Sequence, residues 1–510
     1  MCEIVAFQDE FRQVLPNVTG NVDYEIFRKT LARITELINL SKIDRKVMSE
    51  AVRLSEKEYN LSRHSKGKGP NQLTNKEKIR IQKRARRVLR CGIARHLTGD
   101  AYRVFSCRLA DSALLQNFCL IDRMDQIKVP SKSQLQRDEA LFEEGFLRKI
   151  VSEMTGQAAQ APNSEEDKQV LGLAKEVSLE QYFLDTTCLK ANIHFPVDWV
   201  LLRDATRTLM KAVQLIRTEG LKNRMSDPET FIRQINRLSI QMTNTRRQKD
   251  GKRKRKKVLR LMKKLVFKVA RHAAFHRDIL SNRYEETRFT KSHALQIIGR
   301  IDKVLEQLPQ AVYQAHERII GERQVPNRFK ILSLYEKDIH VIVRGKADAE
   351  TEFGNTLLLG EQTNGIILDW ELYKEKVSSD SQLLKQSIER IGTYYPCRPV
   401  SVTTDRGFDS LDNRLYLGKV GIENNICPKS VPALKEKMQQ TSFRENQKRR
   451  GQTEARIGIL KNGFLGNPLK SKGFASRQMS VAWAVLAHNL WVIARLPCAE
   501  NSHNNHQQAA

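Results

Sequence analysis

The strand-forming segments of this chain fall into two places that are separated by a long helical stretch. One buried strand candidate, "YFLDTTCLK" (182–190), comes before the stretch. The other candidates come only after residue 328, whereas residues 200–328 carry a helical pattern. A single sheet therefore has to join segments from both sides, and we expect residues 200–328 to be a helical insertion.

The segments after the insertion predict strands first and then strands alternating with helices. Residues 329–335 and 339–344 indicate one hairpin, and residues 355–360 and 365–370 a second pair of strands. A helix, a strand, a helix, a strand and two helices should follow, at 378–392, 399–405, 409–418, 422–428, 444–463 and 476–496. This order favours a mixed central sheet with helices packed against it. It is also the order of the ribonuclease-H-like fold, although other mixed sheets share it.

The remaining segments complete the expected domain organisation. Residues 1–155 combine helical periodicity with many basic residues, and they resemble a helix-turn-helix DNA-binding region. A polar linker of small residues is expected at 156–170, and a disordered tail at 498–510. The catalytic domain would consist of 171–199 and 329–497. The expected fold class is thus an α/β core with an all-α N-terminal region and a helical insertion.

The charge balance indicates a polyanionic partner. The chain has 88 Lys and Arg against 58 Asp and Glu, a net charge of +30. Nucleic acid is the favoured partner, and an anionic membrane surface is the second. The densest basic run, at 246–257, lies in the insertion and is expected to contact the DNA backbone in a salt-sensitive way. A solvated basic tip or a nuclear-localisation signal has the same composition.

The cysteines and the apolar stretches indicate in which cellular compartment the chain is found. None of the eight cysteines forms a CxxC pair, which argues against a zinc site or a disulfide framework and fits a reducing cytosol. The N-terminal sequence has no signal-peptide apolar core. The longest apolar stretch, at 479–496, contains His488, Asn489 and Arg495, so it is interpreted as a buried helix and not as a membrane span.

Three acidic side chains occupy positions from which they could meet at one end of the sheet. Asp185 lies inside an apolar strand, where a buried carboxylate is unfavourable unless a cation or hydrogen bonds satisfy it. Asp405 ends another strand, and Glu454 lies on a predicted helix. Oxygen ligands of this kind favour Mg²⁺ or Mn²⁺. Two such ions can activate a water or a 3′-hydroxyl for phosphodiester displacement.

The helix that carries Glu454 also carries two cations on the same face. Arg450, Glu454 and Lys461 are at offsets −4, 0 and +7, which fall within roughly 40° of one another on a regular helix. A basic–acidic–basic stripe suits a metal-binding carboxylate with cations placed for phosphates. A solvated face with an i,i+4 ion pair is the alternative.

Three stretches of the sequence resemble signature blocks of bacterial insertion-sequence transposases of the Asp-Asp-Glu type. "LDTTCLKANIHFPVDWVLLRD" (184–204) is similar to the block around the first aspartate, and "VTTDRGFDS" (402–410) to the second. "RRGQTEARIGILKN" (449–462) fits the Arg-(three residues)-Glu-(six residues)-Lys signature. "AWAVLAHNLWVIARL" resembles the C-terminal helix of the family, and "GKADAETEFG" the turn after its early strands.

The resemblance implies roles for single residues. Asp185, Asp405 and Glu454 would bind the metal, two Mg²⁺ or Mn²⁺ ions, and Arg450 and Lys461 would contact phosphate or DNA. The catalytic domain would be ribonuclease-H-like. The protein would bind terminal inverted repeats, nick them and join their 3′-hydroxyls to target double-stranded DNA. Because two DNA ends have to be paired, a homodimer is expected in the DNA complex. A cytoplasmic, nucleoid-associated location and no membrane partner are expected as well.

One position departs from the family, and two other functions stay open. Many members carry a tyrosine three residues before the signature arginine, where this chain has Gln447. The alternatives are a structure-selective, metal-dependent DNA nuclease or resolvase on the same fold, and a non-catalytic nucleic-acid-binding protein.

Other acids and histidines near these blocks are expected to be structural. Asp409 should cap the helix that follows it, and Asp198 should end the first block as a loop acid. Asp204 is a further nearby carboxylate. His194 and His488 are expected to be hydrogen-bonded structural histidines.

Overall fold

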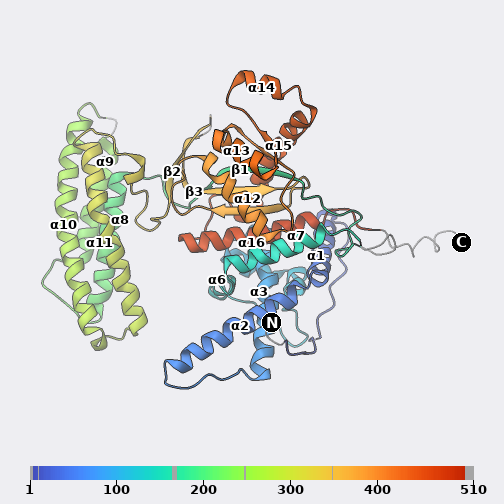
Figure 1. The fold of residues 1–510 in the computed structure, drawn as a ribbon. Coiled ribbons are helices and arrows are strands. Elements are labelled where there is room, and N and C mark those ends of the chain that lie inside the picture. Colours follow the sequence, from blue (N-terminus) through green and yellow to red (C-terminus); the bar gives the residue numbers. More distant parts are fainter. Residues whose placement is uncertain (1–3, 10, 163–168, 246–247, 347–348, 500–510) are drawn as a thin grey trace. The chain divides into compact units, whose positions relative to one another are not determined.

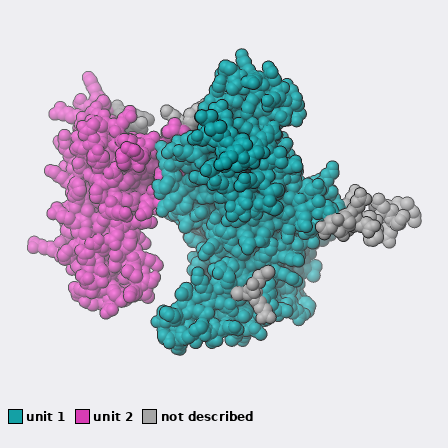
Figure 2. All heavy atoms as spheres, viewed as in Figure 1, with its two compact units in different colours: residues 1–190, 356–510 teal, residues 191–355 magenta. Residues whose placement is uncertain are grey.

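The computed structural model describes residues 4–9, 11–162, 169–245, 248–346 and 349–499 (Figure 1). The chain divides into two compact units, which Figure 2 distinguishes by colour. Unit 1 consists of Met1–Lys190 and Thr356–Ala510, and unit 2 of Ala191–Asn355. Most of the expected tail, residues 500–510, lies outside the described residues, as do 163–168 of the expected linker.

The first part of unit 1 is helical, as expected. Its helices α1 to α7 are Val22–Leu40, Ile43–His64, Asn75–Thr98, Tyr102–Asp111, Ala113–Phe118, Lys132–Glu139 and Glu144–Ala158. Part of the positive charge of α3 turns inward: Arg90 lies 3.2 Å from Asp44, and Arg95 pairs with Glu139. These arginines join helices to one another, so the basic face expected for α3 is smaller than its composition indicates.

Unit 1 contains most of a sheet with both parallel and antiparallel strands, and helices pack against it. This confirms the predicted α/β core. The six-stranded sheet has the order β2-β3-β1-β5-β6, with β4 paired to β3. β1, β5 and β6 are parallel to one another, whereas β3 is antiparallel to both β2 and β4. Strands β1 to β6 are Gln181–Lys190, His340–Lys346, Ala349–Glu361, Ile367–Leu372, Ser401–Thr404 and Glu423–Ile426.

One predicted strand is wrong. Residues 330–335 form no strand, and β2 makes its hairpin with β3 instead. The cause lies in side chains of α11, which take up this backbone. Gln314 accepts from the Ile331 N–H at 2.8 Å, and Gln307 donates to the Leu334 carbonyl at 3.2 Å. Of the apolar residues that suggested a strand, Leu334 is buried in the core of the helical unit, whereas Phe329 and Tyr335 are about half exposed.

Helices cover both faces of the sheet. Because successive strand residues point to opposite faces, Tyr182 of β1 reaches Ser387 of α12 through its hydroxyl, at 2.7 Å. Phe183 points the other way, and the Arg449 guanidinium of α15 lies 4.7 Å from its ring centroid. Helices α12 to α16 are Leu383–Tyr394, Leu411–Val420, Val431–Lys437, Thr441–Ile459 and Phe474–Ile493. α15 therefore covers the face that carries the odd-numbered residues of β1.

The N-terminal helices share their core with the sheet. α16 packs against α3 and α7, and Figure 1 shows α7 beside it. Gly92 of α3 allows this approach, because a Cβ there would lie 2.8 Å from the Trp483 ring of α16. The expected boundary at 156–170 therefore does not separate two compact units. Within the described ranges, no helix has both the length and the apolar character needed to cross a membrane.

In the described residues of unit 2, four helices form an apolar core of their own. They are α8 to α11, at Asp198–Thr218, Pro228–Asn244, Gly251–Arg283 and Lys291–Ile319. On α10 the predicted apolar stripe is buried at Val258, Leu259, Met262 and Val266, but Leu261 is 47% exposed. Residues 191–199 and 329–355, expected in the catalytic domain, belong to this unit. Asp198 explains part of this, since Arg318 of α11 holds its carboxylate at 3.0 Å.

Candidate active site

Asp185 and Asp405 lie just beyond the point where the pairing of two neighbouring parallel strands ends: Asp185 is inside β1, and Asp405 directly follows β5. In the β1–β5 register Phe183 is paired with Thr403, and each aspartate comes two residues after its paired residue. Residues two apart on a strand point to the same face. Both side chains therefore lie on the face of the sheet that α15 covers.

The Asp185 carboxylate is largely buried, with 13% of its side chain exposed, and it has few compensating partners. Its Oδ1 accepts the Thr186 N–H at 2.7 Å, and Arg450 Nη1 lies 4.0 Å from its Oδ2. Burial and the neighbouring charge of Asp405 raise the pKa of Asp185 to about 7, with Glu454 adding to the effect and Arg450 and the Thr186 hydrogen bond opposing it. Negative charge at this position is therefore unfavourable unless a further cation arrives.

Asp405 opens a short 3₁₀ turn, Arg406–Phe408, and its Oδ1 accepts the Gly407 N–H at 2.9 Å. A Cβ on Gly407 would lie 3.0 Å from Asp405 Oδ1 and 3.1 Å from Asp380 Oδ2. Asp380 is thus a fourth carboxylate close to this turn, and its own segment gave no signal of a site. A side chain at position 407 would therefore crowd both carboxylates.

The capping role predicted for Asp409 is wrong. Ser410 caps α13, because its side chain accepts the Asn413 N–H at 3.2 Å. Asp409 instead accepts the Lys429 N–H at 2.9 Å and pairs with Arg414 at 3.3 Å. It joins two loops and does not belong to the candidate site.

Glu454 is near the two aspartates, but its side chain does not point toward them. Its Oε1 lies 3.5 Å from Arg450 Nη1, and its side chain is 60% exposed. In the part of the chain that the structure describes, no three His, Cys, Asp or Glu side chains already form a group that could hold a metal ion. The two aspartates therefore converge, whereas Glu454 would have to turn from solvent toward Asp185 to complete the predicted triad.

Lys461 reaches the same face by a route that the sequence did not predict. The expected continuous helix at 444–463 ends at Ile459, and Lys461 lies in a π-helix, Leu460–Leu465. Its i→i+5 hydrogen bonds change the angle between residues, so the one-face estimate does not extend to Lys461. Lys461 Nζ nevertheless donates to Thr187 Oγ1 at 3.1 Å. Thr187 follows Asp185 by two residues, and this spacing could have identified it.

The α3 helix contacts the π-helix that carries Lys461. His96 Nδ1 lies 2.8 Å from the Phe464 carbonyl oxygen. Gly99, which ends α3 at φ +63°, allows close approach, because a Cβ there would lie 2.5 Å from the Gly463 carbonyl oxygen. The N-terminal helices therefore help to position the end of the α15 region.

Gln447 joins α15 to the strand ends. Its Nε2 donates to the Thr404 carbonyl at 3.2 Å and to the Asn425 carbonyl at 2.7 Å. Its Oε1 accepts from Arg450 Nε at 3.3 Å. One side chain thus links the residue before Asp405, the end of β6 and the arginine beside Asp185, a positioning role that the sequence left open.

Other buried acids of the sheet have close cationic partners. Asp369 of β4 accepts from Arg148 at 2.9 Å, from Arg390 at 2.9 and 2.7 Å and from Ser387 at 2.7 Å. Glu361 of β3 accepts from Thr453 at 2.8 Å and lies 3.1 Å from Arg449. These carboxylates are satisfied and hold helices to strands.

The histidines and the remaining acids are not part of the site. His488 is buried, its pKa is lowered to about 4 by burial, and its Nδ1 lies 3.3 Å from Asn489 Oδ1, as expected for a structural histidine. His194 is exposed. Asp204 pairs with Arg203 at 3.0 Å. Asp198 is the first residue of α8 and not a loop acid.

A comparison of the chain with protein-family models found no match. Comparisons with curated proteins and with solved structures also found none.

Proposed function

We propose that the chain is a DNA transposase of the Asp-Asp-Glu type, which cleaves phosphodiester bonds with a divalent metal ion and transfers the strands to target DNA. The observation that carries the proposal is the placement of Asp185 and Asp405 beyond the paired residues of β1 and β5, with Asp185 largely buried and its nearest arginine 4.0 Å away. A buried carboxylate of this kind at the edge of a sheet is typical of a functional site.

The strand order supports a ribonuclease-H-like catalytic core within this proposal. In unit 1, β4 pairs with the C-terminal half of β3, β3 neighbours β1, and β1, β5 and β6 are parallel. Antiparallel strands on one side and parallel strands on the other, with one acid inside β1 and another directly after β5, are compatible with that fold. The helical unit then interrupts the chain between β1 and β2.

The donor set fits Mg²⁺ or Mn²⁺, since Asp185, Asp405 and Glu454 offer only carboxylate oxygens. Such ions, two in the proposed mechanism, would activate a water or a 3′-hydroxyl and stabilise the leaving oxygen. Asp185 has to lose its proton before it can serve as a ligand. Arg450 lies between Asp185 and Glu454 and would neutralise a phosphate there, and Gln447 aims the Arg450 side chain.

The cations of unit 2 are proposed to contact the DNA backbone. The basic run expected at 246–257 enters α10 at Gly251, and residues 246–247 lie outside the described residues. Lys256 and Lys252 pair with Glu322 at 2.8 and 3.5 Å, which offsets part of the charge. The net charge of +30 leaves an excess of cations for phosphates. Inverted-repeat binding, a homodimer in the DNA complex and a cytoplasmic, nucleoid-associated location belong to the same proposal.

A cleavage and joining assay tests the function. Wild type is incubated with Mg²⁺, target DNA and duplexes that carry the ends of the DNA element around its own gene. We expect nicking that exposes 3′-hydroxyls and joining to the target. Asp405→Asn should lose both steps, whereas Asp412→Asn, an exposed acid of α13, should keep both.

The other outcomes separate the alternatives. Cleavage by wild type without joining would indicate the nuclease or resolvase. DNA binding without metal-dependent cleavage by wild type would indicate a non-catalytic binding protein. Full activity of Asp405→Asn would exclude the proposed triad.

A further inference from the structure

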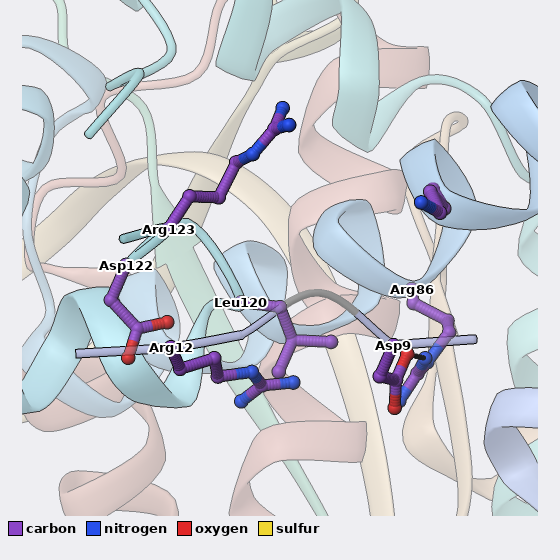
Figure 3. A pocket seen from close by; sticks show the side chains of 7 residues that line it. Asp9, Arg12, Arg86, Leu120, Asp122 and Arg123 are labelled. Atoms are coloured by element: carbon purple, nitrogen blue, oxygen red, sulfur yellow. Dashed lines mark hydrogen bonds and ion pairs between the residues drawn. The ribbon is translucent and has the colours of Figure 1, made fainter. Parts of the chain in front are cut away.

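A small hollow in the N-terminal helical region gathers basic side chains from three segments. Its volume is about 80 Å³. That volume has room for several water molecules, which is the scale of one phosphate group. Figure 3 shows the side chains that line it, which are Asp9, Arg12, Lys83, Arg86, Leu120, Asp122 and Arg123.

Backbone pairing fixes the segments that carry these side chains. Arg12 and Arg123 form an antiparallel bridge, and Gln13 donates its N–H to the Asp122 carbonyl at 3.0 Å. Lys83 and Arg86 come from α3, and the Arg86 Nε lies 3.3 Å from Asp44. The cations are therefore held in place before any ligand arrives, which reduces the ordering that binding requires.

The Asp9 carboxylate lies where an anionic ligand would bind in this hollow. Its Oδ1 lies 2.6 Å from Arg86 Nη1, although its side chain is 58% exposed. Burial by itself would raise the pKa of Asp9, but the hydrogen bond from Arg86 and the charges of Arg86, Arg12 and Lys83 lower it overall. Three cations thus act on one carboxylate that belongs to the N-terminal segment.

The other charged residues of the hollow face elsewhere. In Figure 3 the Arg123 guanidinium points away from Arg12 and Asp9, and its Nε lies 3.4 Å from Asp125. Asp122 is buried, and its Oδ2 accepts from Asn117 at 2.7 Å. Asp122 offsets part of the positive charge, and the cations that face Asp9 still outnumber it.

We propose that this hollow binds one backbone phosphate of double-stranded DNA, and that Asp9 competes with that phosphate for Arg12, Lys83 and Arg86. A phosphate oxygen accepts from the same donors as the Asp9 carboxylate, and it offers further oxygens to the remaining cations. Displaced Asp9 is free to move into solvent, since it is already exposed. The inference rests on the proposed function for the choice of DNA as ligand.

The test measures the affinity of the full chain for a fluorescent DNA duplex by anisotropy, across a salt series. Arg12→Gln should weaken binding about three- to tenfold and lower the salt slope by about one. Asp9→Asn should tighten binding about three- to tenfold, because the competing anion is gone. Arg123→Gln is the matched control, and it should change the affinity less than about twofold.

The proposal is overturned if Asp9→Asn binds no tighter than wild type, or if Arg123→Gln weakens binding as much as Arg12→Gln. Tighter binding of single-stranded or duplex RNA, with the same variant pattern, would overturn DNA as the occupant.

A second probe separates this inference from the proposed function. Inorganic phosphate should raise the thermal unfolding temperature of wild type and of Asp9→Asn, and less that of Arg12→Gln. If wild type binds no DNA while phosphate shows this pattern, the transposase proposal fails and the anion site stands. If phosphate stabilises Arg12→Gln as much as wild type, the anion site fails whatever the catalytic assay shows.

Discussion

Asp185 and Asp369 are both aspartates inside apolar strands of the same sheet, yet they have very different surroundings. The side chain of Asp369 is 2% exposed, and arginines from α7 and α12 hold its two oxygens at 2.7 to 2.9 Å. The side chain of Asp185 is 13% exposed, and its nearest arginine is 4.0 Å away. Asp369 is part of an internal ion-pair network, whereas Asp185 faces Asp405 at the edge of the sheet.

The contrast indicates that Asp369 stabilises the fold, whereas Asp185 is available to bind a ligand. Removing one partner of a buried ion pair leaves the other charge uncompensated, which is strongly destabilising. The negative charge of an acid that lies near other acids is unfavourable in the folded state, so removing that charge costs little stability. The same substitution should therefore destabilise the protein far more at Asp369 than at Asp185.

The largest expected effect is on catalysis. Asp185→Asn should lower the rate of Mg²⁺-dependent DNA cleavage by about 10³-fold, since a metal ion supplies several kcal/mol of transition-state stabilisation. Its folding should be unharmed, which circular dichroism and urea denaturation would check. A variant that cleaves nearly as fast as wild type would place the metal ligands elsewhere.

The next effect is on stability and should fall on the other aspartate. Asp369→Ala should lower the free energy of unfolding by about 3–5 kcal/mol, because Arg148 and Arg390 remain buried without their partner. Asp185→Ala is the control in the same urea denaturation series and should lose far less. Equal losses for both variants would remove the distinction between the two sites.

A smaller effect concerns pH in metal-free protein. The folded-state pKa of Asp185, about 7, lies above its ordinary value of 3.8. Between these values the folded chain binds more protons than the unfolded chain, so this group makes the free energy of unfolding fall as pH rises. In chelator-containing buffer, wild type should lose a few kcal/mol relative to Asp185→Asn between about pH 4 and pH 7. Parallel stability curves for the two proteins would contradict the raised pKa.

The smallest effect concerns the positioning residue. Gln447→Met keeps the size of the side chain but loses its hydrogen bonds to Thr404, Asn425 and Arg450. Cleavage should fall about tenfold, with a stability loss of about 1–2 kcal/mol. Gln452→Met, an exposed residue of the same helix, is the matched control. If both variants behave like wild type, Gln447 does not position the site.

The sequence predicted the parts of the site that depend on local pattern. Apolar runs and turn residues identified the sheet strands, although residues 329–335 were wrongly read as a further strand. The strand order also led us to expect Asp185 and Asp405 at one end of the sheet. The rule that singled out Asp185, an acid in an apolar strand, applies equally to Asp369 in "GIILDW". Only the folded chain shows that Arg148 and Arg390, distant in sequence, satisfy Asp369.

Other features depend on tertiary contacts that no local pattern reports. The π-helix at Lys461 forms where α3 packs against Gly463 and Phe464. The backbone near Ile331 is taken up by side chains of α11. The segment that carries Asp9 is held at the basic hollow by the backbone pairing of Arg12 with Arg123, two residues that are far apart in the chain.

Calorimetry of Mg²⁺ or Mn²⁺ binding, in buffers of different ionisation enthalpy near pH 6, tests the central claim most directly. A ligand that holds a proton has to release it when metal binds. Wild type should bind the ion and release about one proton, while Asp369→Asn, if folded, should do the same and Asp185→Asn should bind weakly without proton release. Equal binding and equal proton release by wild type and Asp185→Asn would contradict the assignment of Asp185 as the metal ligand.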